Sequence, residues 1–89
     1  MKIKLELFGA SRDFSNKDHL ELNVKDKASI DDLRNELINY INKNFQGNEN
    51  FIKVVKSSAF CSENNEIISD NYKITKDQKI GIIPPIGGG

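Results

Sequence analysis

The sequence is poor in the residues that most often build an active site. It has one cysteine, one histidine and no tryptophan among 89 residues. A single cysteine cannot form an internal disulfide, and one cysteine with one histidine cannot enclose a metal ion. No Ser/His/Asp pattern is present, and no glycine-rich loop precedes a helix. We therefore expect no bound metal or cofactor and no catalytic centre within this chain alone.

Net charge and long apolar runs are also missing. The 13 Lys and Arg residues balance the 13 Asp and Glu residues, so the formal net charge is zero. A protein that binds nucleic acid or an anionic membrane needs a basic excess, and we expect neither partner. The apolar runs are too short to span a membrane, and the alternating start Met1–Glu6 lacks the apolar core of a secretory signal. These features predict one soluble cytoplasmic domain.

Alternating apolar residues predict several strands. Ile3, Leu5 and Leu7 alternate with charged residues, and a similar alternation follows Leu20. A polar connection over residues 9–18 joins these two strands without a crossover helix, so they should pair antiparallel. The expected strands are residues 2–8, 20–25, 58–62, 67–68 and 79–83.

One long helix is expected after the second strand. Ser29 has the features of an N-cap, with Asp31 and Asp32 in the first turn, and Gly47 is placed to stop the helix. The apolar residues with helical spacing are Ile30, Leu33, Leu37, Tyr40 and Ile41. Residues 51–56 fit a short strand or a helical turn. The order β-β-α-β-β-β predicts an α+β fold, a mixed sheet with its helix across one face and its first and last strands central.

Four side chains outside the C-terminal stretch are candidates for a role beyond folding. His19 precedes a strand and is typical of a solvated or edge histidine, with a contact role as the alternative. Cys61 fits a small buried hydrophobe better than a reactive thiol in sulfur transfer. Arg12 lies in the loop after the first strand and is either a surface charge or a contact to a partner or an anion. Arg12 and Phe8, which extends the first strand, are the candidate partner contacts.

The C-terminal stretch is the most informative part of the sequence. Pro84 and Pro85 stop the last strand because proline has no backbone N–H for the ladder. Gly87, Gly88 and Gly89 follow Ile86, which offers an apolar grip for a partner. Chance alone rarely ends a chain in consecutive glycines, since glycine is about 7% of average composition. We expect a domain over residues 1–83 and a flexible tail over residues 84–89.

The terminal carboxylate is the one reacting group that this pattern favours. It is ionised at neutral pH and can attack the α-phosphate of ATP to give an acyl-adenylate. A sulfur donor or an amine can then attack that mixed anhydride. Glycine passes through a narrow channel with little steric conflict, so a partner's active site can enclose the end of the chain and exclude water.

The whole sequence resembles the small, sulfur-carrier subunit of molybdopterin synthase. That family ends in a strand, two prolines, a branched apolar residue, a small residue and Gly-Gly, as Ile82–Gly89 does here. Leu7–Asp13 is similar to the family's first strand with its Arg-acid pair, and Ser29–Leu33 fits its helix start. The sequence departs from the family at Phe60-Cys61, where Val-Asn is usual, and at Lys76–Gln78, where Asp-Gly-Asp is usual.

The resemblance implies a ubiquitin-like β-grasp fold with a free Gly-Gly tail. It further implies that an ATP-dependent, E1-like enzyme adenylates Gly89 and that a sulfur donor converts it to a thiocarboxylate. The tail would then enter the large subunit of molybdopterin synthase and donate sulfur to a pyranopterin precursor. The family assembles as a heterotetramer, with small subunits at opposite ends of a large-subunit dimer. ATP would be used by the activating enzyme and not held by this chain.

Two other functions remain open from the sequence. A carrier of the same fold could serve thiamine synthesis or tRNA thiolation, or could be a modifier joined to lysines, because all of these share the fold and Gly-Gly. A plain interaction domain of this fold, with inert glycines, is the third hypothesis. It predicts that deleting Gly89 changes nothing.

Overall fold

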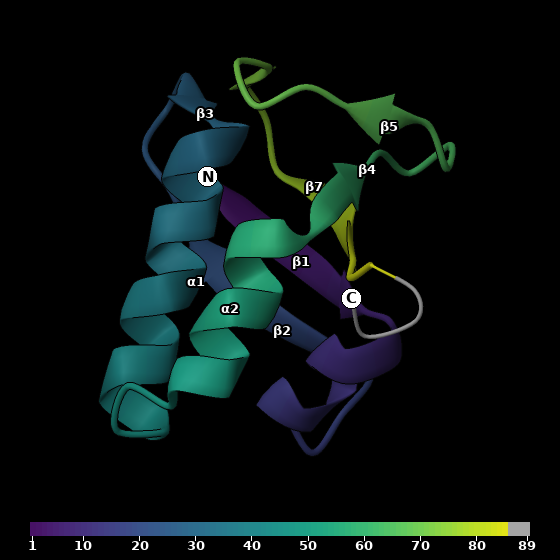
Figure 1. Ribbon diagram of the computed structural model, residues 1–89. Helices are drawn as coiled ribbons and strands as arrows, with labels where there is room; N and C mark the ends of the chain where they lie inside the picture. The colour runs from purple at the N-terminus through teal and green to yellow at the C-terminus, as the bar shows by residue number, and fades with distance from the viewer. Residues whose placement is uncertain (86–89) are drawn as a thin grey trace.

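The computed structural model of the protein describes residues 1–85 and contains a mixed sheet with helices on one face (Figure 1). The strand order is β2-β1-β7-β4-β5, and a separate two-stranded sheet joins β3 to β6. The strands are β1 (Lys2–Leu7), β2 (His19–Asn23), β3 (Ala28–Ser29), β4 (Ala59–Cys61), β5 (Ile67–Ile68), β6 (Lys73–Ile74) and β7 (Gln78–Ile83). The helices are η1 (Gly9–Phe14), α1 (Ile30–Asn44) and α2 (Glu49–Ser57).

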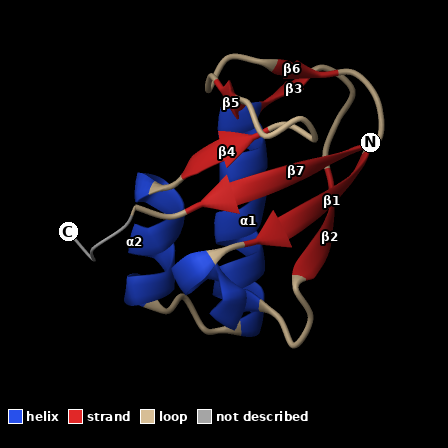
Figure 2. Ribbon diagram, turned by 90° about the vertical axis from the view of Figure 1, so that its right-hand side faces the viewer, coloured by secondary structure: helices blue, strands red, loops and turns tan. Residues whose placement is uncertain are grey.

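The first and last long strands lie side by side in the middle of the sheet, as predicted. β1 pairs in parallel with β7, and β2 and β4 flank them with antiparallel pairing. In β1 the side chains of Ile3, Leu5 and Leu7 are buried while their neighbours face away from the core. Figure 2 shows both α-helices behind this sheet and its other face uncovered by any helix. The sheet therefore has an inner face packed on helices and an outer face without them.

Helix α1 begins and ends where the sequence predicts. The hydroxyl of Ser29 accepts the Asp32 backbone N–H at 3.0 Å, and the Asp32 carboxylate accepts the Ser29 N–H at 2.9 Å. This capping box satisfies two backbone donors at the helix start. At the other end Gly47 has a φ of +70°, and its N–H donates to the Ile41 carbonyl at 3.3 Å. The helix side chains buried against the sheet are Ile30, Leu33, Leu37 and Ile41.

Four elements differ from the expected order of one helix and five strands. Residues 51–56, left open between strand and helical turn, form most of helix α2. The polar connection after β1 contains the 3-10 helix η1, and the short strands β3 and β6 were not expected. Helix α2 forms because Asn48 caps its start by accepting two backbone N–H bonds and because Phe51 packs on Phe14, with ring centroids 5.1 Å apart. Contacts distant in the sequence decide this segment.

In the part of the chain that the structure describes, no helix is long and apolar enough to cross a bilayer. The longest, α1, has 15 residues and carries charged side chains on its exposed side.

Candidate functional site

The site is built around the end of β7, from which the C-terminal residues continue. β7 lies between β1 and β4 and ends at Ile83. Pro84 is buried and Pro85 is exposed. A methyl group added at Gly9 would lie 3.9 Å from the Pro84 ring, so the ring packs beside the turn where Gly9 has a φ of +55°. The chain thus leaves the middle of the sheet from an anchored position.

The remaining predicted tail residues, Ile86, Gly87, Gly88 and Gly89, lie outside the described residues. The reactivity of Gly89 and the partner-binding role of the tail stay predictions. The division into a domain over residues 1–83 and a flexible tail also stays a prediction.

An apolar surface, here called the outer patch, lies on the outer face beside the end of β7. Strand pairing places its members together, because Ala59 is opposite Ile83 and Cys61 is opposite both Gly81 and Ile67. Residues directly opposite in an antiparallel pair share a face. The outer patch consists of Phe8, Ala59, Cys61, Ile67, Gly81 and Ile83. Its two large exposed members are Phe8, with 42% of its surface exposed, and Ile67, with 67%.

Because Gly81 has no side chain, Cys61 and Phe8 can pack closely over its backbone. A Cβ atom added there would lie 2.7 Å from the Cys61 sulfur and 2.9 Å from the Phe8 ring, closer than atoms in contact permit. Cys61 is a free thiol and is buried, in agreement with the interpretation favoured from the sequence. The Ser11 hydroxyl accepts the Phe8 N–H at 2.9 Å and donates to the Phe8 carbonyl at 2.6 Å, which fixes the backbone that carries the ring.

Charged groups border the outer patch on the side of β1 and β7. The Lys79 ammonium donates to the Glu6 carboxylate at 2.8 Å, and this hydrogen bond raises the pKa of Lys79. The Glu63 carboxylate accepts the Lys79 backbone N–H at 2.9 Å. A hollow of about 150 Å³ lies between these groups, Phe8 and Cys61. It is small, and most of the residues that line it are polar.

Arg12 and His19 take the positions that the sequence suggested. Arg12 is exposed in η1, which packs against β7 and lies beside its end (Figure 1). It makes no hydrogen bond or ion pair with residues 1–85, so its guanidinium is available to a partner. His19 lies on the edge strand β2, with its Nδ1 atom 3.0 Å from the Asp18 carboxylate. That hydrogen bond lowers the pKa of Asp18.

No metal centre is indicated by the side chains of residues 1–85. Nowhere in this range do three or more His, Cys, Asp or Glu side chains gather closely enough to hold a metal ion. Residues 1–85 thus offer a binding surface beside the end of β7.

Comparison with known proteins identifies the family. A model of the ThiS family matches residues 5–89. The chain belongs to the ThiS family. This membership confirms the class expected from the terminal motif, a ThiS-family sulfur carrier or ubiquitin-like small modifier. A search of curated proteins gives no match.

Three of the solved structures that match this chain illustrate the shared fold. SAMP1 from Haloferax volcanii matches with a TM-score of 0.68 at 14% identity, over 100% of both chains. A putative molybdopterin converting factor, subunit 1, from Pyrococcus furiosus matches with a TM-score of 0.68 at 20% identity, over 96% of this chain and 98% of that one. Caldiarchaeum subterraneum ubiquitin matches with a TM-score of 0.61 at 17% identity, over 100% of this chain and 98% of that one. The predicted ubiquitin-like β-grasp fold is confirmed.

Sequence reasoning found Phe8 and the strand end but missed most of the outer patch. Ala59, Ile67 and Gly81 were not singled out. Alternation along β7 already placed Gly81 and Ile83 on the face opposite Ile82. The rest of the outer patch depends on the pairing of β4 with β7. That pairing joins segments distant in the sequence, so no local pattern predicts it.

Proposed function

We propose that this protein carries sulfur on Gly89 for the synthesis of molybdopterin. The observation that carries the proposal is a ThiS-family domain whose Gly-Gly end continues from a central strand beside an exposed apolar surface. The structural likeness to a molybdopterin converting factor subunit supports the choice of pathway. Since activation uses ATP, the proposal also implies a cytoplasmic protein.

The chemistry proceeds in two substitutions at the terminal carboxyl group. A carboxylate oxygen of Gly89 attacks the α-phosphorus of ATP, and pyrophosphate leaves. A sulfur nucleophile then attacks the carbonyl carbon of the acyl-adenylate, and AMP leaves with the bridging oxygen. When the nucleophile is the outer sulfur of a persulfide, a second thiol attacks the donor sulfur of the resulting acyl disulfide, so that a disulfide leaves and the thiocarboxylate remains. The thiocarboxylate sulfur then attacks the pyranopterin precursor. Hydrolysis of the acyl group restores the carboxylate.

Tail length limits where a partner can bind. Four residues follow Pro85, and a fully extended chain of that length spans at most about 14 Å. An active site that reaches Gly89 must therefore lie close to the end of β7. The outer patch and Arg12 are the surfaces next to that end. We propose that the E1-like activating enzyme and the large subunit of molybdopterin synthase both bind there, in turn.

Intact-mass analysis tests the carrier function directly. The protein is incubated with ATP, an activating enzyme and a sulfur donor, and the expected mass gain is that of one oxygen exchanged for one sulfur. Fragmentation should locate the gain on the last residue. A chain that lacks Gly89 is the first control, and it should gain no mass. Absence of the gain with every activating enzyme tried would refute the proposal.

A Phe8→Asp variant separates docking from chemistry. Its carboxylate would place a charge in the outer patch, so loading of Gly89 should slow while the fold stays intact. Ile38→Asp is unsuitable as a control because Ile38 packs on the core. Asn39→Asp is a better one, because Asn39 is exposed on α1, which lies on the other face of the sheet from the outer patch. Equal loading of Phe8→Asp and the unaltered protein would refute docking at the outer patch.

Reconstitution tests the pathway. Thiocarboxylated protein is mixed with the pyranopterin precursor and a large subunit, and formation of the dithiolene is measured. Failure to form dithiolene, with loading intact, would favour another sulfur-transfer pathway.

Attachment to lysines of other proteins is a second candidate function. The structural likeness to SAMP1 and to an archaeal ubiquitin favours it. In this case an amine attacks the acyl-adenylate and forms an isopeptide bond at Gly89. Tagged protein would then appear in larger species on denaturing gels, and deletion of Gly89 would remove them.

A further inference from the structure

The edge strand β2 has a row of backbone groups with no strand beside it. β2 pairs only with β1 among the described strands. Met1 and Val24 exchange both backbone hydrogen bonds, at 2.7 and 2.9 Å, and the Leu7 N–H donates to the Asp18 carbonyl at 2.9 Å. In an antiparallel ladder, residue pairs that exchange hydrogen bonds alternate with pairs that do not. In β2, the residues of the second kind have N–H and C=O groups that point away from β1. Those residues are His19, Glu21 and Asn23.

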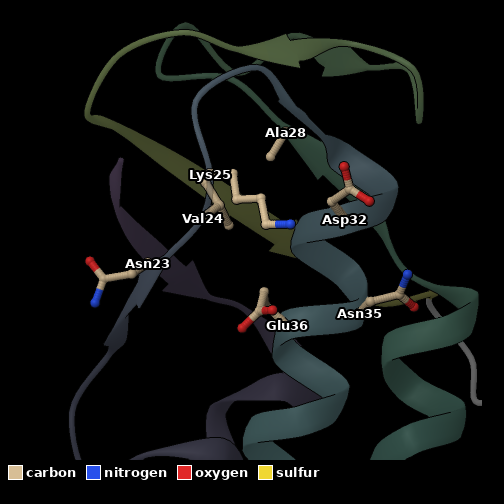
Figure 3. Close-up of a pocket in the computed structure, with 7 residues that line it drawn as sticks. All are labelled: Asn23, Val24, Lys25, Ala28, Asp32, Asn35 and Glu36. Carbon is tan, nitrogen blue, oxygen red and sulfur yellow. The ribbon is translucent and has the colours of Figure 1, made fainter.

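Two surface hollows lie along the same edge, between β2 and α1. One, of about 390 Å³, adjoins the end of β2 and the first half of α1, with Val24 and Ala28 as apolar lining (Figure 3). The other, of about 640 Å³, adjoins the start of β2 and the last turns of α1, with Leu20 and Phe45 as apolar lining. An added strand would send alternate side chains toward α1. The hollows are thus placed to receive apolar side chains near its two ends.

The charges along this groove favour a basic occupant. Figure 3 shows the side chains of Lys25 and Glu36 directed into the space between the strand end and α1. Among the residues that line the two hollows, four are aspartate or glutamate and two are lysine. The charged groups are Asp13, Glu21, Asp32, Glu36, Lys17 and Lys25. Lys2 and Glu21 form an exposed ion pair at 3.7 Å, and such pairs contribute little to stability.

A second copy of this chain fits the edge poorly. A symmetric antiparallel pairing that uses all three outward residues places His19 opposite Asn23 and Glu21 opposite Glu21 of the other copy. Like charges directly opposite on a sheet are destabilising. A foreign strand with lysine or arginine at that position would turn the repulsion into attraction.

We infer that β2 is a docking site for an extended segment of a partner protein, which adds as a further strand and carries basic residues between apolar ones. Main-chain hydrogen bonds to His19, Glu21 and Asn23 hold the segment, and the two hollows select its side chains. This site is separate from the outer patch and does not involve Gly89.

The probe for this site is a short capped peptide that alternates valine and lysine and spans the length of β2. Titration into isotope-labelled protein should shift the backbone amide resonances of His19, Glu21 and Asn23. A valine–glutamate peptide should bind more weakly. A peptide N-methylated at the positions that face β2 should not bind, because it lacks the donors.

Charge reversal at Glu21 provides the matched test. Glu21→Lys should weaken binding of the valine–lysine peptide about fivefold, from loss of a cross-strand charge pair and gain of a like-charge one. Glu66→Lys, an equal change beside β5, should leave binding unchanged. Absence of amide shifts, or shifts confined to the outer patch, would overturn the inference. A concentration-dependent dimer that protects the β2 amides would overturn it in favour of a second copy.

Discussion

Arg34 is expected to be the most important charged residue for stability. Its side chain is only 12% exposed although it lies on a helix surface. One guanidinium nitrogen donates to the carbonyls of Val55 and Ser58, at 2.7 and 2.8 Å, and the other donates to the Asp70 carboxylate at 2.9 Å. The guanidinium also lies over the Phe60 ring, 4.9 Å from its centroid. One side chain of α1 therefore joins the end of α2, strand β4 and the loop before β6.

The perturbation is Arg34→Met, which keeps the apolar stem and removes every donor. Two partly buried carbonyls lose a charged donor, and each such loss costs about 1–3 kcal/mol. The Asp70 pair adds less than about 1 kcal/mol, because Asp70 is exposed. We expect a loss of about 3 kcal/mol in the free energy of unfolding, or roughly 15 °C in Tm for a chain of this size.

The assay is urea unfolding with the slope of the transition compared between variants. Arg34→Lys should lose about half as much, since one ammonium cannot reproduce the planar fork. Arg12→Met is the matched control, because the Arg12 guanidinium bonds to none of residues 1–85, and it should stay within about 0.5 kcal/mol. A loss below about 1 kcal/mol for Arg34→Met, or an equal loss for Arg12→Met, would refute the reasoning.

Further predictions concern the outer patch, the start of α1 and the groove beside β2. Gly81→Ala places a methyl group 2.9 Å from the Phe8 ring and closer still to a sulfur, so it should cost about 1–2 kcal/mol in urea unfolding and move the ring resonances; unchanged spectra would contradict this. Ser29→Ala should cost about 1 kcal/mol by loss of the N-cap. Hydrogen bonds from the Ser29 backbone N–H, the larger cause, and from its side chain lower the pKa of Asp32, so the stability from this pair is present above pH 3.8 and is lost as the pH falls through the lowered value. Acid unfolding of Ser29→Ala, which keeps the backbone N–H, should show that component reduced, whereas Asp32→Asn should lack it. Tyr40→Phe should cost about 1 kcal/mol, since the hydroxyl donates to a backbone carbonyl at 2.7 Å, and burial raises the pKa of Tyr40, which ultraviolet titration above pH 10.0 can check.

The long elements could be predicted because each repeats one period over several residues. β1 alternates strictly, and α1 combines helical spacing with a capping box and a terminal glycine. Residues 51–56 lack this information, since Phe, Ile and Val suit either a strand or a helix. Their helix depends on the Asn48 cap and on packing against Phe14, which lies far away in the sequence. Strands β3 and β6 contain two residues each, too few to show any period.

The two arginines show the same limit at the level of single residues. Sequence alone does not distinguish Arg12, which is exposed, from Arg34, whose guanidinium donates to two backbone carbonyls and a carboxylate. Each arginine has at least one polar neighbour in the sequence, and no local pattern shows whether its side chain is exposed or buried. The distinction arises because α2 ends beside α1, and that contact is tertiary.

The outer patch and the β2 edge differ in what they demand of a partner. An enzyme that acts on Gly89 must cover the end of β7, since four residues reach at most about 14 Å beyond Pro85. In the proposed function, the outer patch would meet that enzyme with apolar area around Phe8 and Ile67. Two strands, β1 and β7, separate the β2 edge from β4, and this edge offers backbone hydrogen bonds and excess negative charge instead. Binding at that edge requires no contact with the end of β7. A protein recruited there by a basic strand can therefore be retained while partners exchange at Gly89, and the valine–lysine peptide should leave loading of Gly89 unchanged.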